Sequence, residues 1–389
     1  MRRNILLFKL MFMFNGLWLF SAMAVIYFEQ VCHSYALAML AFSFVNISQC
    51  LMEIPCGMLS DRYSRKATLV MGESCLFLNM LFWALAGYYQ LPILLFLGSC
   101  LRGSGLAFKS GTETAMIYET LKQIRKRKIF MVVLAKITSF HQLGLLLAAL
   151  TATVITFYFS LKTLVWLSVV PAFLNVLVVS LMVNPKHQFE KEMTLQKQLK
   201  KSLLLFFRKK KLRKYAMLTI LNTSLSTSVF RFEAAYFEQL LQIYWISIVR
   251  ILQHALGCLS FHLAAMLDKR NLIKIIFYSA MGNSLVRLIG LIMNNTIAPF
   301  VVAMQNLFYG PAESSSITLL QQEYNNSLRA TLDSMIGLFA CIGTALMSFL
   351  IGLIADFYSI RGILIGCCVC GMGIAFSYHR LLKPIKVKK

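Results

Sequence analysis

The chain has 389 residues, of which 58% are hydrophobic, with a formal net charge of +24 and a mean hydropathy of +0.69. A soluble domain is far less apolar, so this composition excludes a soluble globular protein. Apolar runs of about 20 residues recur along the chain, and each is long enough to cross a bilayer as a helix. The runs are too long and too uniformly apolar for barrel strands, so we predict an all-α membrane protein.

The sequence predicts twelve transmembrane helices in chain order. They are expected at residues 5–28, 34–58, 68–88, 91–118, 129–158, 161–183, 215–239, 243–266, 272–293, 297–320, 330–355 and 360–381. The first run follows Arg2 and Arg3 and resembles a signal peptide, but it is too long for an h-region and lacks a small-x-small cleavage site. We therefore expect it to remain as the first helix.

Cations gather in alternate loops. They occur at Arg2, Arg3, Arg62, Arg65, Lys66, Lys122, Arg125, Lys126, Arg127, Lys128, Lys269, Arg270, Lys274, Arg380, Lys383, Lys386, Lys388 and Lys389, and again between the sixth and seventh helices. The opposite loops offer only Lys162 and Arg361. The positive-inside rule then predicts a multi-pass protein of the cell membrane with both termini in the cytoplasm. The charge sets topology and attracts anionic lipids, and it requires no nucleic-acid partner.

A basic segment divides the chain into two halves. We predict an N-terminal six-helix bundle at 1–183, a linker at 184–214, and a C-terminal six-helix bundle with a short basic tail at 215–389. In the linker, Leu195, Leu199, Leu203 and Phe206 fall on one helical face. This pattern predicts an amphipathic helix on the inner leaflet. A regulatory site of the calmodulin-target type is the alternative.

The loop after the second run combines a glycine, an aspartate and several cations: Gly57, Asp61, Arg62, Arg65 and Lys66. Asp61 is at helical spacing from Arg65, and it could also face the N-terminus of the next helix, where negative charge is favoured. An ordinary basic loop that follows the positive-inside rule is the simpler interpretation.

The loop pattern G-x-x-x-D-R-x-x-R-[RK] resembles the loop between helices two and three of major facilitator superfamily transporters. The stretch from Leu97 through Arg102 to Gly105, followed by Ser110 to Leu121, is similar to the fourth helix of a drug-transporter-like branch. Weaker echoes follow helix eight, at Ala264 to Arg270, and end helix eleven, at Gly352 to Arg361. The resemblance implies two six-helix halves around a central cavity. It also implies a gate formed by Gly57, Asp61, Arg62, Arg65, Lys66 and Glu119.

Ionisable residues inside a bilayer are costly and are functional candidates by default. We expect the substrate or proton path to involve Arg102, Lys109, Glu113, Lys136, His141, Arg231, Glu233, Arg250, His254 and Glu313. The spacing places Arg102, Lys109 and Glu113 on one helical face. Arg250, His254 and His262 share a stripe, although the two histidines could instead be hydrogen-bonded interior residues.

The resemblance implies that helices one, four, seven and ten surround one water-filled space. Glu73 in the third helix and Arg287 in the ninth are then expected to be peripheral, as snorkelling or capping residues. Cations on the cavity helices outnumber carboxylates by five to three, because Arg102, Lys109, Lys136, Arg231 and Arg250 oppose Glu113, Glu233 and Glu313. An unpaired buried cation is costly, so we expect an anionic or zwitterionic solute.

Motifs for other functions are missing from the sequence. There is no G-x-x-x-x-G-K-[ST], H-E-x-x-H or G-x-S-x-G, which argues against an ATP-driven pump and against an enzyme. The cysteines are scattered through apolar runs, and Cys367, Cys368 and Cys370 are interpreted as small hydrophobic residues and not as metal ligands. No cofactor or metal is predicted.

We therefore expect a monomeric secondary active transporter that moves a small-molecule substrate by alternating access, with protons as the coupling ion. One alternative is a drug/proton antiporter that exports lipophilic compounds. Antiporter members usually carry a G-P dipeptide in the fifth helix, whereas the stretch from Lys136 to Ala149 has Gly144 and no proline. The other alternative is a transporter-shaped sensor that moves nothing.

Overall fold

The computed structural model describes residues 2–62, 64–110, 112–125, 129–185, 209–266, 271–323 and 329–380, and these residues form helices with no strand. The chain divides into two compact units. The N-unit comprises Met1–Glu190 with Ile243–Ile248, and the C-unit comprises Lys191–Gln242 with Val249–Lys389.

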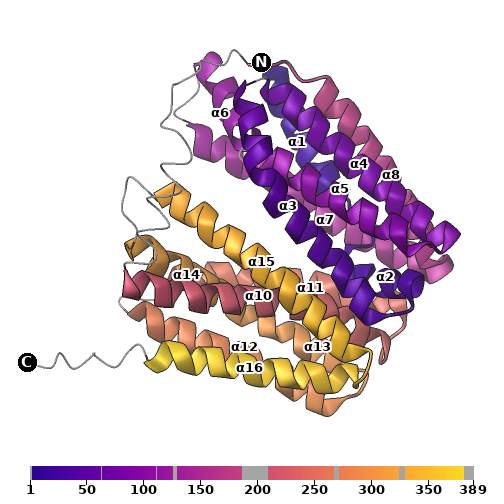
Figure 1. Cartoon of the computed structure of the whole chain (residues 1–389), viewed down its shortest axis with the longest axis vertical. Helices are drawn as coiled ribbons and strands as arrows, with labels where there is room; N and C mark the ends of the chain where they lie inside the picture. Colours follow the sequence, from indigo (N-terminus) through magenta and orange to yellow (C-terminus); the bar gives the residue numbers. More distant parts are fainter. Residues whose placement is uncertain are drawn as a thin grey trace, which may run out of the picture. The chain divides into compact units, whose positions relative to one another are not determined.

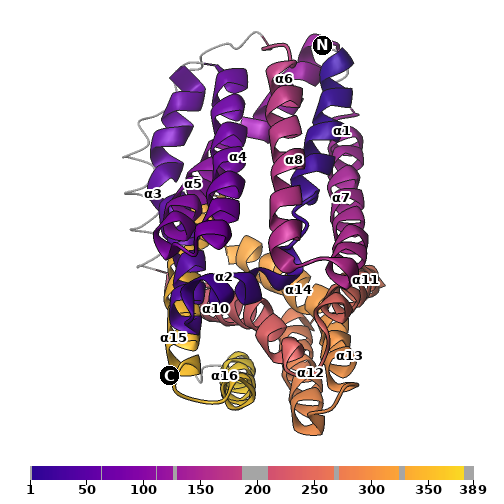
Figure 2. The ribbon, with the colours of Figure 1, turned by 90° about the vertical axis from the view of Figure 1, so that its right-hand side faces the viewer.

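The N-unit contains α1 (Arg2–Gly16), η1 (Ser21–Met23), α2 (Ala24–Cys32), α3 (Tyr35–Arg62), α4 (Arg65–Tyr89), α5 (Pro92–Lys109), α6 (Thr112–Gln123), α7 (Phe130–Tyr158) and α8 (Leu161–Ser180) (Figure 1). Within this unit α4 packs against α5 and α8, α3 against α5, and α1 against α7. Figure 2 shows these long helices lying side by side.

The C-unit contains α10 (Lys210–Glu238), most of α11 (Ile243–Met266), α12 (Leu272–Met293), α13 (Ala298–Ala303), η4 (Met304–Phe308), α14 (Tyr309–Glu323), α15 (Arg329–Ala355) and α16 (Ile360–Arg380). Here α12 packs against α14 and α16, and α10 packs against α15 and α16.

All twelve predicted runs coincide with helical segments, so the all-α fold is confirmed. Nine helices among the described residues are long and apolar enough to cross a membrane. The three remaining runs, at 91–118, 215–239 and 297–320, are more polar. They carry the ionisable residues of the fourth, seventh and tenth predicted helices, which explains why their mean hydropathy is lower.

Three of the predicted runs are not continuous helices. The first is broken between α1 and α2, the fourth between α5 and α6, and the tenth by the 3₁₀ segment η4. At the first break, α1 ends at Gly16, whose Cβ position would lie 2.9 Å from the Cα of Gly144 on α7. Two glycines therefore let α1 and α7 approach closely, as small residues do between membrane helices.

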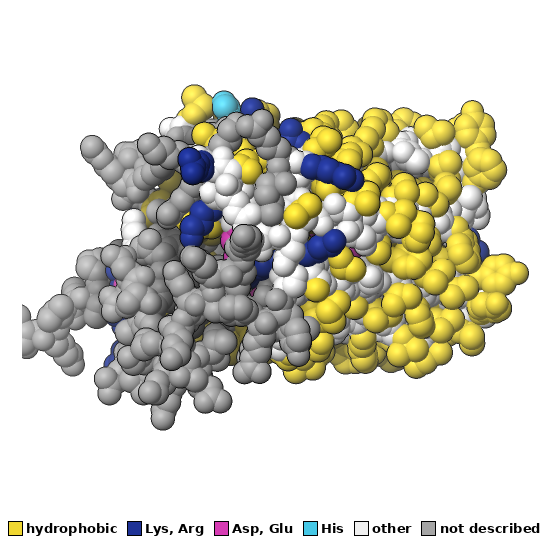
Figure 3. Space-filling model, turned by 90° about the horizontal axis from the view of Figure 1, so that it is seen from above, with side chains coloured by type: hydrophobic (Ala, Val, Ile, Leu, Met, Phe, Trp, Pro, Cys, Tyr) yellow, Lys and Arg dark blue, Asp and Glu magenta, His cyan; other side chains and the backbone are white. Residues whose placement is uncertain are grey.

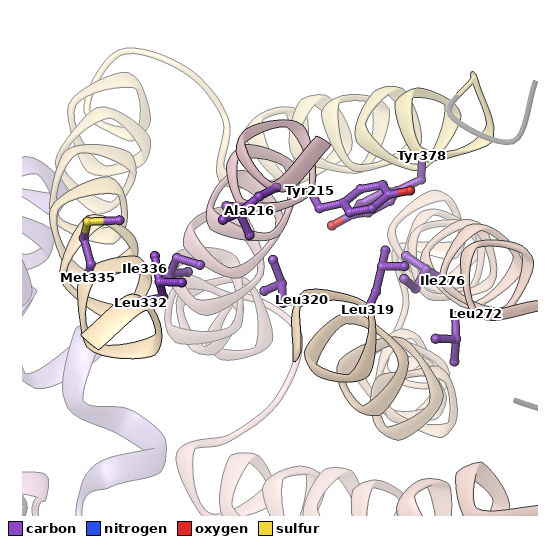
Figure 4. Packing of buried hydrophobic residues seen from close by; sticks show 11 residues of the cluster. Tyr215, Ala216, Leu272, Ile276, Leu319, Leu320, Leu332, Met335, Ile336 and Tyr378 are labelled. Carbon is purple, nitrogen blue, oxygen red and sulfur yellow. The ribbon is translucent and has the colours of Figure 1, made fainter. Parts of the chain in front are cut away.

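Each unit has its own hydrophobic core. In the C-unit, side chains from α10, α12, α14, α15 and α16 meet around Leu212, Ile276, Leu320, Leu332 and Tyr378 (Figure 4). In the N-unit, α1, α4, α6, α7 and α8 contribute a second cluster that includes Phe8, Leu69, Met116, Ile137 and Val179. Large hydrophobic side chains also cover much of the surface seen in Figure 3, as expected for helices that face lipid.

Several sequence predictions lie outside the described residues. They include the amphipathic linker face at Leu195, Leu199, Leu203 and Phe206, the echo at Asp268 to Arg270, the cations at Lys126 to Lys128, and the basic tail beyond Arg380.

Candidate functional site

The N-unit contains a buried triad of charged residues formed by Lys109, Glu73 and Glu113. Lys109 is the last residue of α5, and its Nζ lies 2.7 Å from Glu73 Oε1 on α4 and 3.2 Å from Glu113 Oε1 on α6. The contact with Glu113 crosses the break between α5 and α6. Lys109 and Glu113 therefore lie on the same side, as predicted, although they belong to two different helices. Because one cation opposes two carboxylates, the triad has a formal charge of −1.

Two asparagines complete the environment of Glu73. Asn15 Nδ2 on α1 donates to Glu73 Oε1 at 3.1 Å, and Asn175 Nδ2 on α8 donates to Glu73 Oε2 at 2.8 Å. The Glu73 side chain is 2% exposed. Its contacts with Lys109, Asn15 and Asn175 connect α4 to α5, α1 and α8. The expectation of a peripheral, snorkelling Glu73 is wrong, because α4 packs between α5 and α8 and turns this residue inward.

The triad lines a cavity of about 490 Å³ within the N-unit. Its polar lining comes from Asn15, Gln49, Glu73, Arg102, Lys109, Ser110, Glu113, Thr114, Thr138, His141, Ser168 and Asn175, and Phe12, Phe14, Leu76 and Met80 are among its apolar residues. The volume falls in the range of small-molecule sites, and so does the mixture of apolar walls with a few polar groups.

Arg102 lines this cavity two turns before Lys109 on α5. Its guanidinium carbon lies 3.8 Å from the ring centroid of Trp18 and 5.5 Å from that of Trp83. Trp18 falls in the break between α1 and η1, so the interrupted first span supplies the aromatic surface for this cation–π contact.

The C-unit has a buried charged network of its own. Glu233 on α10 is 1% exposed, and it lies 2.9 Å from Arg287 Nε on α12 and 3.7 Å from Arg250 Nη1 on α11. Gln253 and Gln305 donate further hydrogen bonds to its carboxylate at 3.1 Å and 2.7 Å. The expectation of a peripheral Arg287 is therefore wrong, because α12 turns this residue onto the Glu233 carboxylate.

A second, smaller cavity of about 90 Å³ lies among α10, α12, α14 and α16. Glu313 and Arg287 are its charged lining residues, and Thr223, Thr227, Asn283, Ser284 and Tyr309 are among its polar ones. Arg287 is already paired with Glu233. Among the described residues, Glu313 makes no ion pair and no hydrogen bond through its carboxylate.

The gate residues are described in part. Arg65 Nε lies 3.3 Å from Glu119 Oε1, which joins the start of α4 to α6. The side chains of Asp61 and Arg62 and the contacts of Gly57 lie outside the described residues. α3 ends at Arg62 and α4 begins at Arg65 with Ser64 as its N-cap, so Asp61 and Arg65 belong to different helices, and their expected pairing lies outside the described residues.

The other predicted path residues are divided between the two units. His141 lines the N-unit cavity, and Arg231 is half-buried on α10. Lys136, His254 and His262 are solvent-exposed in this structure, and the His254 ring packs edge-on against Phe230. Arg250 is buried on the same stripe of α11, where it stacks over Phe230 at 4.1 Å.

Glu73, Asn15, Asn175 and Gln305 were missing from the predicted path. Glu73 is the only charged residue of the run at 68–88, and that isolation is itself a functional indication for a residue in a bilayer. The amides carry no comparable indication, since neutral polar residues are common in membrane helices. Among the described residues, no group of three His, Cys, Asp or Glu side chains could hold a metal ion.

The fold and these buried ionisable sites define a multi-pass helical membrane protein with polar cavities inside its bundles. The model of the Major Facilitator Superfamily matches residues 6–346, and the chain belongs to that superfamily. It is therefore a transporter and not an enzyme. A comparison with curated protein sequences gives no match.

Solved structures of transporters share the fold. A point mutant of the nucleoside transporter NupG superposes with a TM-score of 0.83 at 14% identity, over 97% of this chain and 98% of that one. A D-xylose–proton symporter gives a TM-score of 0.71 at 17% identity over 96% of both chains. The E. coli fucose:proton symporter FucP gives 0.59 at 15% identity, over 97% of this chain and 98% of that one. At these identities the likeness concerns the fold alone.

Proposed function

We propose that the chain is a proton-coupled secondary transporter that moves a small polar solute by alternating access. The observation that carries the proposal is a pair of buried, ionisable sites, one in each unit, inside helices that must cross a membrane. Such residues are costly in a bilayer and are retained where they bind a solute or carry protons.

Glu313 is the proposed proton carrier. It is a carboxylate in a small polar cavity, and its described neighbours give it no ion pair that would hold it in the ionised form. The other titratable groups lining that cavity are Arg287, which is paired with Glu233, and Tyr309 and Cys367. A carboxylate in such a place can gain and lose a proton without breaking an ion pair.

The N-unit cavity is the proposed solute site. Its volume suits a small metabolite, and its lining is rich in amides, hydroxyls and paired charges. This lining favours a polar solute over the lipophilic compounds of the drug-exporter alternative. The neighbouring gate pair, Arg65 with Glu119, is proposed to close one face of the N-unit during the cycle, together with Gly57, Asp61, Arg62 and Lys66.

We place the protein in the cell membrane as a monomer with both termini in the cytoplasm. The cation asymmetry of the loops supports this topology. The linker and the tail are proposed to contact anionic lipid, because both are strongly basic.

The test is a proton-flux assay on the purified full-length chain in proteoliposomes that hold a pH-sensitive dye. A panel of metabolites and drugs is added one compound at a time. A transported solute should change the internal pH, and Glu313→Gln should abolish that change. The exposed variant Lys162→Gln, which lines neither cavity, should leave it intact. Flux of a solute without any pH change would overturn the proton coupling, and the absence of flux across the panel would favour the sensor alternative.

A further inference from the structure

The two carboxylates that share Lys109 lie in different surroundings. Glu73 is 2% exposed, and its oxygens receive hydrogen bonds from Asn15 and Asn175 besides the 2.7 Å contact with Lys109. Glu113 is 20% exposed and lines the cavity, and among the described residues Lys109 Nζ, at 3.2 Å, is its ion-pair partner. Three fixed donors therefore hold Glu73 as an anion, whereas Glu113 is open to protons from the cavity.

A proton on Glu113 neutralises the triad. With both carboxylates ionised the triad carries −1, and a net charge inside a membrane protein is costly. The proton leaves Lys109 as an ammonium group paired with Glu73 and brings the net charge to zero. Lys109 and the N-terminus of α6, where Glu113 is the second residue, favour the ionised form in turn. Glu113 can therefore both gain and lose its proton.

The protonated form of Glu113 also has an acceptor in the same cavity. Asn175 is 1% exposed, and its Nδ2 donates to Glu73 Oε2, which fixes the orientation of the amide. Its Oδ1 lines the cavity as a buried acceptor with no partner among the described residues. A neutral carboxyl supplies one O–H donor, which this oxygen can accept directly or through a water in the cavity.

α6 is a separate twelve-residue helix that two ion pairs hold at different points. Near its start Glu113 contacts Lys109 on α5, and six residues later Glu119 contacts Arg65 on α4. The rise between the two carboxylates is about 9 Å along the helix. A helix this short transmits a tilt from one end to the other. Loss of the Glu113 contact on protonation therefore also displaces the gate pair.

The charged groups around Glu113 come from three other helices. The residues that line the cavity with it are Lys109 and Arg102 from α5, Glu73 from α4 and His141 from α7. The described lining residues of α1, α3 and α8 are apolar or neutral polar. Lys9 on α1 is directed to the Phe140 ring of α7 at 5.3 Å, and Glu53 on α3 accepts from Ser110. His141 is thus the main competing site for a proton in this cavity.

We propose that Glu113 is a proton-binding regulatory site that links the acidity of the N-unit cavity to the Arg65–Glu119 gate pair. Ionised Glu113 holds α6 against Lys109 and lets the gate close, whereas protonated Glu113 loosens the start of α6 and keeps the gate from closing. Because the gate closes only over ionised Glu113, this proton returns to the side from which it came, and Glu313 remains the proton carrier. The inference rests on the proposed transport function, whose regulation it describes.

The first test needs no solute. Hydrogen exchange of the unmodified full-length protein in detergent is measured by mass spectrometry over a range of pH, and rates are converted to protection factors. Protection of the α6 amides should fall about fivefold as the pH falls, which corresponds to the loss of one half-buried ion pair. The reference helix is α16 in the C-unit, and its protection factors should stay constant.

Variants assign this transition to one residue. Glu113→Gln should show low protection of α6 at every pH. Glu73→Gln gives Lys109 to Glu113 alone, which favours ionised Glu113, so the transition should move to lower pH. His141→Gln and the exposed-cation control Lys162→Gln should both keep the transition of the unmodified protein.

Three results would overturn the proposal: constant protection of α6 across the pH range, a transition that survives in Glu113→Gln, and a transition that disappears in His141→Gln. If Glu113→Gln does not fold, Glu73→Gln decides the point. An unshifted transition in that variant would then show that the titrating group is not the carboxylate that shares Lys109.

The second test measures exchange of a solute from the flux panel across proteoliposomes with equal pH on both sides. Exchange by the unmodified protein should slow about fivefold in acid, and Glu113→Gln should be equally slow at neutral pH. If α6 loosens in acid while exchange stays constant, the link to the gate is wrong and the transport function stands. If no solute moves at all, the transport proposal fails, and hydrogen exchange in α6 still decides whether Glu113 binds the proton.

Discussion

Lys109 Nζ lies 2.7 Å from Glu73 Oε1, and this contact fixes the end of α5 against the middle of α4 inside the N-unit. Both side chains are buried. Removing one partner of a buried pair leaves an uncompensated charge, which is far more damaging than removing both.

Lys109→Gln should therefore destabilise the protein by about 3–5 kcal/mol, because it leaves the buried carboxylates of Glu73 and Glu113 without their shared cation. The change is measured as a lower apparent Tm of the purified protein in detergent. The exposed variant Lys162→Gln serves as the control and should leave Tm unchanged. Glu73→Gln should be less damaging than Lys109→Gln, because it leaves Lys109 paired with Glu113 at 3.2 Å, and equal damage in both would show that Lys109 does not hold the two carboxylates together.

The glycine contact between α1 and α7 gives a steric prediction. Gly16→Ala should destabilise the protein by about 1–3 kcal/mol, because the new methyl group would clash with the backbone carbonyl oxygen of His141 and would lie 2.9 Å from the Cα of Gly144. Gly257→Ala on α11 is the matched control, since nothing lies within 4 Å of its Cβ position. Thermal unfolding of both variants decides the point. Equal Tm values would mean that α1 and α7 separate easily at this site.

The gate pair should affect turnover more than solute binding. Arg65 and Glu119 are in contact at 3.3 Å, and neither lines the N-unit cavity. A half-buried ion pair contributes about 1 kcal/mol, so Glu119→Gln should slow transport by about fivefold with solute affinity unchanged. The exchanged variant Arg65→Glu/Glu119→Arg should recover part of the rate. Loss of affinity in Glu119→Gln would place this residue in the binding site instead.

The loop charges make a prediction about topology. In a variant without native cysteines, single cysteines at Lys126 and Lys201 should react only from the cytoplasmic side, and one at Asn294 only from outside. Membrane-impermeant maleimide labelling of intact cells measures this accessibility. Reaction of the Lys201 position from outside would reverse the predicted orientation of the linker.

The fold was predictable because each bilayer crossing leaves a long apolar run in the sequence. The breaks in the first and tenth runs were not predictable, since they depend on packing between distant segments. Gly16 is unremarkable in sequence, and only its approach to Gly144 explains why α1 can end there against α7.

The site was predictable only in part for the same reason. The spacing of Lys109 and Glu113 is local, and their contact follows from it. The pairing of Lys109 with Glu73, and of Arg287 with Glu233, joins different helices and leaves no trace in spacing. Assigning Glu73 and Arg287 to the periphery by helix number alone was wrong, because a helix at the edge of a bundle still has an inward face.

The most direct test of the central claim compares two transport modes in the Glu313→Gln variant. Exchange of labelled solute across proteoliposomes of equal pH needs no net proton movement, whereas accumulation driven by a pH gradient does. With a solute identified in the flux panel, we predict that the variant retains exchange at a rate near that of the unmodified protein and loses accumulation. Accumulation at the unmodified level would contradict a proton-carrying role for Glu313, and with it the proposed coupling mechanism.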